Sequence, residues 1–198
     1  MIKAGITGGM GSGKSVVSAI FATAGIPVYC ADDESKRLAD TSPVIREKLK
    51  ALVGKTVYKG ENLDRQKLAS IIFNDETILK NVNKIIHPVV RADFTEWVEK
   101  QTAEYCALES AILYESGFDK EVDVVLTVYA PMELRLNRVM LRDGASETEV
   151  LQRMKRQLSD ELKQARADFV IVNDGEQPLI PQVERFIGWL REKFINPI

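Results

Sequence analysis

Residues 8–15 read G-G-M-G-S-G-K-S, the phosphate-binding pattern G-x-x-x-x-G-K-[ST], and they constrain the fold more than any other stretch of the chain. The glycines let the backbone curl so that successive N–H groups point inward at phosphate oxygens. Lys14 adds a positive charge for the outer phosphates, and the Ser15 hydroxyl can ligate Mg²⁺. The pattern predicts a nucleoside triphosphate site, since a chance match would occur in fewer than about one chain in fifty at ordinary glycine content.

The segments on either side of this loop have the composition that such a site needs. Residues 2–7 form a short apolar run with β-branched members, which is typical of a buried strand. Residues 16–24 place apolar side chains on one face of a helix. A strand, a glycine-rich loop and a helix N-terminus together make an anion-binding site.

Length and composition are those of an enzyme-sized protein. With 198 residues, 45% of them hydrophobic, the chain can bury one main domain with a smaller insertion. No apolar run approaches the roughly 20 residues of a membrane span and no signal-peptide pattern is present, so we expect a cytoplasmic protein. Cys30 and Cys106 lie in apolar, strand-like segments, which favours reduced, buried thiols over a disulfide framework. His87 is the only histidine, which excludes a His-rich metal site.

The distribution of charge points to a local anion site. The net charge of −2 gives no general footprint for nucleic acid or a membrane surface, and we expect neither as a partner. Residues 135–156 depart from this balance, because they contain six basic and three acidic side chains. We therefore expect an anionic ligand beside this segment.

Five apolar runs predict the strands of a sheet. They lack clean alternation, as expected for parallel strands covered by helices on both faces. Their alternation with helical segments indicates an α/β protein with a doubly wound five-stranded parallel sheet of the P-loop nucleoside triphosphate hydrolase type. The strands are expected at residues 2–7, 25–30, 105–109, 122–128 and 168–172.

Two helical segments interrupt this predicted core. Residues 33–103 carry helical signals, including Asp64 as an expected N-cap and apolar side chains at helical spacing before Pro88. We interpret them as a substrate-binding insertion. Residues 133–162 are interpreted as a helical lid. The nucleotide-binding core then comprises residues 1–32, 104–132 and 163–198.

The lid segment carries three arginines on one predicted helix face, since Arg135, Arg138 and Arg142 are spaced i, i+3 and i+7. Asp143-Gly144 should end that helix, and Ser-Glu-Thr-Glu at residues 146–149 should start another with a capping box. Two such helices can close over a nucleotide and exclude water from the transferred phosphoryl group. The alternative is a solvated surface helix.

Two carboxylates follow the second predicted strand at its carboxyl end, where open α/β sheets bind their ligands. Either Asp32 or Asp33 could accept the proton of an attacking hydroxyl group. Aspartate also suits a helix N-cap, which is the alternative role for each.

Further motifs follow the loop in a fixed order. They are Ala31-Asp32, Leu63-Asp64-Arg65 with Leu68-Ala69 and Phe73, Ile86-His87-Pro88, Leu113-Tyr114-Glu115-Ser116-Gly117, Arg138 with Arg142-Asp143-Gly144, Gln157, and Ala167-Asp168 with Asn173-Asp174-Gly175. This ordered set spans nearly the whole chain and resembles the dephospho-CoA kinase family. It is far more specific than the phosphate loop alone.

The resemblance implies a kinase that uses ATP and Mg²⁺ to phosphorylate the ribose 3′-hydroxyl of dephospho-CoA, giving coenzyme A and ADP. It implies that Asp32 is the general base, and that Lys14 and Arg142 are also catalytic. It implies substrate contacts by Asp32, His87 and Glu115. The implied nucleotide-binding residues are Gly8, Gly11, Ser12, Gly13, Lys14, Ser15, Val16, Arg138 and Asn173.

The chain departs from the usual family pattern at three positions. The usual Asp-Ala-Asp after the second strand begins here with Cys30, which leaves Asp32 of that pair. A proline usual before the Leu-Leu-x-Glu segment is Ala111, and the acidic residue two positions earlier is Glu109 instead of the more common aspartate. Glu109 either supports Mg²⁺ through water, alongside Ser15, or ends a strand.

Other P-loop proteins are the alternatives to this interpretation. A different small-molecule kinase would share the loop, sheet and lid and would differ in the insertion. A regulatory GTPase should carry Asn-Lys-x-Asp after a strand, whereas residues 83–86 read Asn-Lys-Ile-Ile within a helical run. For His87, a turn-forming or helix-end residue before proline is the alternative to substrate binding. We expect a monomer or a small homo-oligomer.

Overall fold

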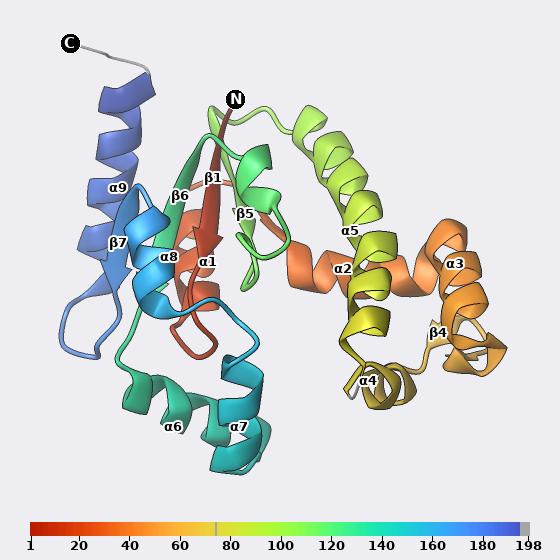
Figure 1. The fold of residues 1–198 in the computed structure, drawn as a ribbon. Helices are drawn as coiled ribbons and strands as arrows, with labels where there is room; N and C mark the ends of the chain where they lie inside the picture. Colours follow the sequence, from red (N-terminus) through yellow and green to blue (C-terminus); the bar gives the residue numbers. More distant parts are fainter. Residues whose placement is uncertain (74, 195–198) are drawn as a thin grey trace. The chain divides into compact units, whose positions relative to one another are not determined.

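The computed structural model describes residues 1–73 and 75–194, which form two compact units. The first unit combines residues 1–29 with the chain from residue 101 onward, and the second comprises Cys30–Lys100. Each unit has its own helices and strands (Figure 1).

A five-stranded sheet organises the first unit, with the strand order β2-β5-β1-β6-β7. β1 runs parallel to β5 and β6, and β6 runs parallel to β7. The doubly wound parallel sheet expected from the sequence is thereby confirmed. The strands are β1 Ile2–Thr7, β2 Val28–Cys30, β5 Tyr105–Glu109, β6 Val124–Tyr129 and β7 Phe169–Val172.

The second strand begins three residues later than expected, because the preceding helix ends in a glycine turn. Gly25 has φ +79°, a left-handed conformation that glycine adopts without a Cβ clash. The N–H of Ile26 then donates to the carbonyl of Phe21 over 3.0 Å, which closes the last helical turn. Residues 25–27 consequently connect helix and strand, and β2 keeps only three residues.

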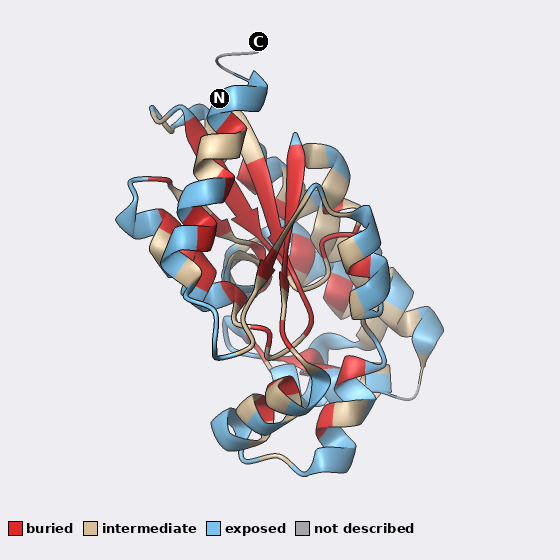
Figure 2. Ribbon diagram, turned by 90° about the vertical axis from the view of Figure 1, so that its left-hand side faces the viewer, coloured by how far each residue is buried: buried red, intermediate tan, exposed pale blue. Residues whose placement is uncertain are grey.

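Both faces of the sheet are covered, and the core lies between sheet and helices (Figure 2). On one face, the fully buried side chains of Ile6, Phe21 and Phe186 pack together, which brings α1 and α9 against the strands. On the other face, Gly5 lies against Leu113. The helices of this unit are α1 Lys14–Thr23, η2 Phe118–Glu121, α6 Met132–Asp143, α7 Glu147–Met154, α8 Asp160–Arg166 and α9 Leu179–Phe194.

The second unit is mostly helical, and the long helix α5 packs against α2, α3 and α4. A short hairpin of β3 and β4 was not expected. It is held by Asp40, which accepts from the N–H of Leu63 over 2.8 Å. The elements are α2 Ala31–Thr41, α3 Pro43–Val53, η1 Lys55–Val57, β3 Tyr58–Lys59, β4 Asn62–Leu63, α4 Arg65–Phe73 and α5 Glu76–Glu99.

Helix α5 continues through Pro88. Proline lacks an N–H and therefore removes one backbone hydrogen bond from the helix. The buried side chains of Val82, Val90 and Phe94 lie on both sides of the proline, and their packing holds the helix together across it.

Neither of the two cysteines, both within the described residues, forms a disulfide, and their surroundings differ. Cys106 is fully buried in β5, as expected, and burial raises its pKa to about 11. Cys30 is only half-buried, because it caps the N-terminus of α2. The prediction that both thiols are buried is therefore wrong for Cys30.

Candidate active site

The phosphate loop joins the carboxyl end of β1, the central strand, to the N-terminus of α1. Gly11 and Gly13 have φ values of +81° and +95°, which favour glycine, and Gly13 is the N-cap of α1. The first N–H groups of a helix have no intrahelical acceptor and carry partial positive charge. The loop and the first turn of α1 therefore form an anion site.

Lys14 lies inside this loop and is only 9% exposed. Its ammonium donates to the carbonyls of Gly8 and Gly9 over 3.1 and 3.3 Å. These two contacts hold the positive charge at the loop, where the outer phosphates of a nucleotide would bind.

Three consecutive loop carbonyls accept hydrogen bonds from side chains outside the loop. Arg135 donates to Met10 over 3.3 Å, Arg138 to Gly11 over 3.5 Å, and Asn173 to Ser12 over 2.8 Å. Asn173 and Arg138 also contact each other, since the Asn173 carbonyl accepts from the Arg138 guanidinium over 3.2 Å. The predicted nucleotide-binding residues Arg138 and Asn173 thus lie at the loop.

The three arginines of the lid segment have different surroundings. Arg135 is buried and forms an ion pair with Asp160, and Arg138 is half-buried at the loop. Arg142 is exposed and forms an ion pair with Asp143 over 2.7 Å. Among the described residues, Arg135 and Arg138 donate hydrogen bonds to the loop, whereas Arg142, in the same helix, pairs with Asp143.

The helix break in the lid segment is confirmed. Gly144 follows α6 in a left-handed conformation with φ +62°, and Ser146 and Glu149 form the expected capping box of α7. Asp143 lies at this break and accepts from Arg142 and from Arg153, which lowers its carboxyl pKa to about 2. Figure 1 shows α6 and α7 beyond the carboxyl ends of β1 and β6.

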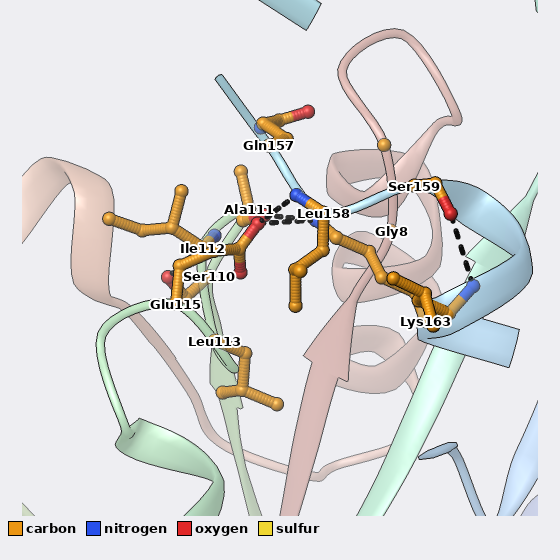
Figure 3. A network of polar contacts seen from close by, with 12 residues as sticks. Gly8, Ser110, Ala111, Ile112, Leu113, Glu115, Gln157, Leu158, Ser159 and Lys163 are labelled. Atoms are coloured by element: carbon orange, nitrogen blue, oxygen red, sulfur yellow. Dashed lines mark hydrogen bonds and ion pairs between the residues drawn. The ribbon is translucent and has the colours of Figure 1, made fainter. Parts of the chain in front are cut away.

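The segment after β5 is tied to α8 through Glu115 and Lys163 (Figure 3). Glu115 accepts from the N–H of Leu158 over 2.7 Å and pairs with the Lys163 ammonium over 3.4 Å. Lys163 is fully buried and donates to the carbonyl of Ala111 over 2.6 Å, and burial lowers its pKa. Glu115, a predicted substrate contact, therefore has protein partners in the first unit.

Asp32 and Asp33 lie in the first turn of α2, directly after β2. Both are exposed, and Asp33 pairs with Lys36 over 2.8 Å. Cys30 is the N-cap and makes no side-chain capping bond. The N-cap alternative is therefore wrong for both aspartates, while the base role of Asp32 stays a prediction.

His87 lies within α5 and is half-buried. Burial lowers its pKa, and the positive charge of Arg91 lowers it further. A neutral imidazole is therefore favoured near pH 7. The helix-end alternative is wrong, because α5 extends twelve residues beyond His87, to Glu99.

The donor set suits a magnesium ion, since Ser15 and Glu109 supply a hydroxyl and a carboxylate. Ser15 lies in the first turn of α1, and Glu109 ends β5 opposite Ile6 in β1 with 8% exposure. Both residues thus lie at the end of the sheet that carries the phosphate loop. In residues 1–73 and 75–194, no group of three or more His, Cys, Asp or Glu side chains gathers into a metal cage.

The fold and the site define a protein class. A parallel sheet carries a phosphate loop on its central strand, a lysine lies in that loop, and basic side chains of a helical segment lie beside it. This arrangement is the P-loop kinase fold. Among the described residues, none of the helices combines the length and hydrophobicity of a membrane span.

Comparisons with known proteins narrow the class to one family. A sequence model of the dephospho-CoA kinase family matches residues 2–178. Dephospho-CoA kinases of Bacteroides fragilis and Porphyromonas gingivalis are 50% and 46% identical to the chain, over 97% and 100% of it and 94% and 98% of their own lengths. A crystal structure from Thermus thermophilus matches with a TM-score of 0.84 and 35% identity, over 98% of this chain and 97% of that one. The chain belongs to the dephospho-CoA kinase family.

Asp160 and Lys163 are residues that sequence reasoning did not assign to the site. Asp160 lies in the first turn of α8 and pairs with Arg135, 25 positions earlier. Lys163 contacts Ala111, 52 positions earlier. No local pattern marks either residue, because both partners are distant in the sequence.

Proposed function

We propose that this chain phosphorylates the ribose 3′-hydroxyl of dephospho-CoA with ATP, giving coenzyme A and ADP, the final step of coenzyme A synthesis. The observation that carries the proposal is the phosphate loop with Lys14 held against its carbonyls, in a chain that belongs to the dephospho-CoA kinase family. ATP binds with its outer phosphates in the loop and its charge beside Lys14 and Arg138.

Phosphoryl transfer is a displacement at the γ-phosphorus of ATP. The ribose 3′-oxygen forms a bond to the γ-phosphorus, the bond to the β,γ-bridging oxygen breaks, and ADP leaves. We assign the proton of the hydroxyl group to the carboxylate of Asp32, which also orients the attacking oxygen. Lys14, Arg138 and, after lid movement, Arg142 stabilise the charge that develops on the transferred group.

The Ser15 hydroxyl and, through water, the Glu109 carboxylate would hold Mg²⁺, which would neutralise charge on the phosphate oxygens. The first turn of α1 supplies Ser15, whose exposed side chain can reach a phosphate-bound ion. The N–H groups of that turn bind phosphate at the same time.

The helical second unit and the segment after β5 are proposed to bind dephospho-CoA. His87 belongs to that helical unit, and a neutral imidazole can both donate and accept a hydrogen bond. Glu115 follows β5 and belongs to the motif that the family resemblance assigns to the acceptor side.

The test is ADP release with ATP and Mg²⁺ against a panel of acceptors, with the product confirmed by mass. The panel contains dephospho-CoA, pantetheine phosphate, nucleosides and shikimate. We expect turnover on dephospho-CoA alone, yielding coenzyme A. Activity on another acceptor and none on dephospho-CoA would retain the P-loop kinase and reject the proposed substrate.

The role of Asp32 has its own test, because Asp32→Asn keeps the size of the side chain and removes the proton acceptor. Loss of a general base lowers turnover by about 10²- to 10⁴-fold. The affinity for ATP should stay unchanged, which calorimetric titration measures. Near-normal turnover with intact ATP binding would show that Asp32 is not the base, and Asp33→Asn serves as the matched control.

A further inference from the structure

Arg135 carries a guanidinium that is buried beside the phosphate loop. Its side chain is only 6% exposed, although it lies in the first turn of the largely solvated helix α6. A buried charge needs an ion pair and hydrogen bonds to offset its lost hydration. Arg135 has both, since it forms an ion pair with Asp160 and donates to the carbonyl of Met10 over 3.3 Å.

Both backbone polar groups of Met10, the carbonyl and the N–H, form hydrogen bonds with side chains outside the loop. Arg135 binds the Met10 carbonyl, and the side-chain oxygen of Gln157 accepts from the Met10 N–H over 2.9 Å. The Met10 side chain packs against a buried cluster that includes Val139 and Val150. The tip of the phosphate loop is thus docked onto α6, α7 and the turn that follows α7.

Holding a carbonyl also orients the next N–H group. In a trans peptide, the carbonyl of one residue and the N–H of the next point in opposite directions. A Met10 carbonyl turned toward Arg135 therefore directs the Gly11 N–H to the opposite side of the peptide. The same geometry applies to Ser12, whose carbonyl accepts from Asn173 over 2.8 Å and whose next N–H belongs to Gly13.

The ion pair fits against the loop without spare room. A Cβ added to Gly9 would lie 2.1 Å from the Nη1 atom of Arg135 and 2.6 Å from the Oδ1 atom of Asp160. Both distances are far below the 3.4 Å at which ordinary contacts begin. The paired side chains thus form a close-fitting support for the loop backbone.

The ion pair also joins the two ends of the lid segment. Arg135 lies in the first turn of α6 and Asp160 in the first turn of α8, with α7 between them. The chain between them, residues 136–159, therefore begins and ends at the Arg135–Asp160 ion pair beside the loop.

We propose that Arg135, held by Asp160, is a positioning residue of the phosphate loop. It fixes the Met10 peptide so that the loop N–H groups face the nucleotide phosphates, and it anchors both ends of the lid segment to the loop. It acts through the loop and touches no substrate. The inference rests on the proposed ATP site and assigns a role to a residue outside it.

The test compares nucleotide affinity with acceptor affinity in the full chain. Arg135→Ala should raise the Kd for MgADP and the KM for ATP by about 10- to 100-fold, the loss expected for a hydrogen bond to a charged group. The KM for dephospho-CoA should change by less than roughly twofold, because the acceptor does not bind the loop. Arg135→Lys should restore only part of the loss, since one ammonium lacks the planar fork that reaches Met10 and Asp160 together.

Arg166→Ala is the matched control. Arg166 lies in α8 of the same unit and pairs with Asp119 over 3.3 Å, and its guanidinium stacks over Tyr114 instead of the loop. This variant should leave the Kd for MgADP and the KM for ATP unchanged. Asp160→Asn keeps the side-chain volume and removes the charge that holds Arg135, so it should raise the Kd for MgADP in the same direction as Arg135→Ala.

The outcomes separate the proposals. If Arg135→Lys and Asp160→Asn bind MgADP as tightly as the unchanged protein, the positioning role is overturned, even if Arg135→Ala fails to fold. A purely structural role would also overturn the proposal. It would be shown if a variant raised the KM for ATP and the KM for dephospho-CoA equally, and if both increases disappeared well below the melting temperature of that variant. If the protein without any substitution binds no MgADP, or does not phosphorylate dephospho-CoA, the proposed function itself is rejected.

Discussion

Replacing Gly11 by alanine tests whether the phosphate loop is pressed against α6. Gly11 has φ +81°, and an added Cβ would lie 2.5 Å from the backbone oxygen of Arg135 and 2.9 Å from the Cγ2 atom of Val139. The first distance is about 0.9 Å short of the 3.4 Å at which ordinary contact begins. Because that oxygen belongs to the backbone of a helix, no rotamer change removes the clash.

Two costs follow, and a control variant separates them. A left-handed conformation costs an L-residue about 1–2 kcal/mol, whatever its surroundings. Gly25 has φ +79° and no atom within 4 Å of its added Cβ, so Gly25→Ala carries this backbone cost alone. Gly11→Ala must in addition move the loop away from α6, and a displacement near 1 Å at a binding site costs about 10²-fold in rate, or about 3 kcal/mol.

The assay combines steady-state kinetics with equilibrium unfolding in urea. Gly25→Ala should lose about 1–2 kcal/mol of unfolding free energy and keep kcat/KM for ATP within roughly twofold. Gly11→Ala should lose at least as much stability and lower kcat/KM for ATP by about 100-fold. A Gly11→Ala protein with the same kcat/KM as Gly25→Ala would refute the reasoning, because the loop would then tolerate displacement from α6.

Three further predictions concern the core and the titratable groups. Phe186→Ala, at a fully buried side chain, should cost about 3–5 kcal/mol of unfolding free energy in urea, whereas Leu141→Ala, at a side chain that is 87% exposed, should cost less than about 0.5 kcal/mol. Cys106, with its pKa raised to about 11 by burial, should resist alkylation by iodoacetamide at pH 8 until urea unfolds the chain, as followed by intact mass. The pKa of the Asp143 carboxyl is about 2 in the folded protein, against an ordinary value of 3.8. The ionised carboxylate therefore stabilises the fold at pH values above 3.8, and this stabilisation is lost as the pH falls toward 2. The difference in unfolding free energy between the unchanged protein and Asp143→Asn should therefore be constant above about pH 5 and shrink below it; a difference independent of pH would contradict the ion pairs at this carboxylate.

Elements with strong local signals were predicted well from the sequence. β5 has the expected bounds, residues 105–109, and the helix break at Gly144 and the capping box of α7 lie where their residues predicted them. These features are decided within a few residues, by glycine conformation and by side-chain bonds to nearby N–H groups. The N-cap alternative for Asp32 and Asp33 is wrong, because α2 begins at Ala31 and includes both aspartates, which leaves Cys30 as the N-cap.

Features that depend on distant partners were not predicted. The helix through Pro88 persists because buried side chains on both sides of the proline hold it, and the short hairpin of β3 and β4 depends on Asp40 from α2. The three arginines of α6 have similar sequence spacing and different surroundings, since only Arg135 meets Asp160. A periodic pattern specifies which face a residue occupies, and only the packing of other elements decides what covers that face.

The sequence by itself determined the phosphate loop and the alternation of strands and helices, because these depend on residue types at short, fixed spacings. The resemblance to a kinase family came from motifs in a fixed order along nearly the whole chain. The tertiary structure alone decided the strand order β2-β5-β1-β6-β7, the burial of Arg135 against the loop and the contacts of Lys163 with Ala111 and Glu115. Those interactions join segments tens of residues apart. Which of these segments meet depends on the order in which the chain places its strands and helices in space, and a local sequence pattern does not specify that order.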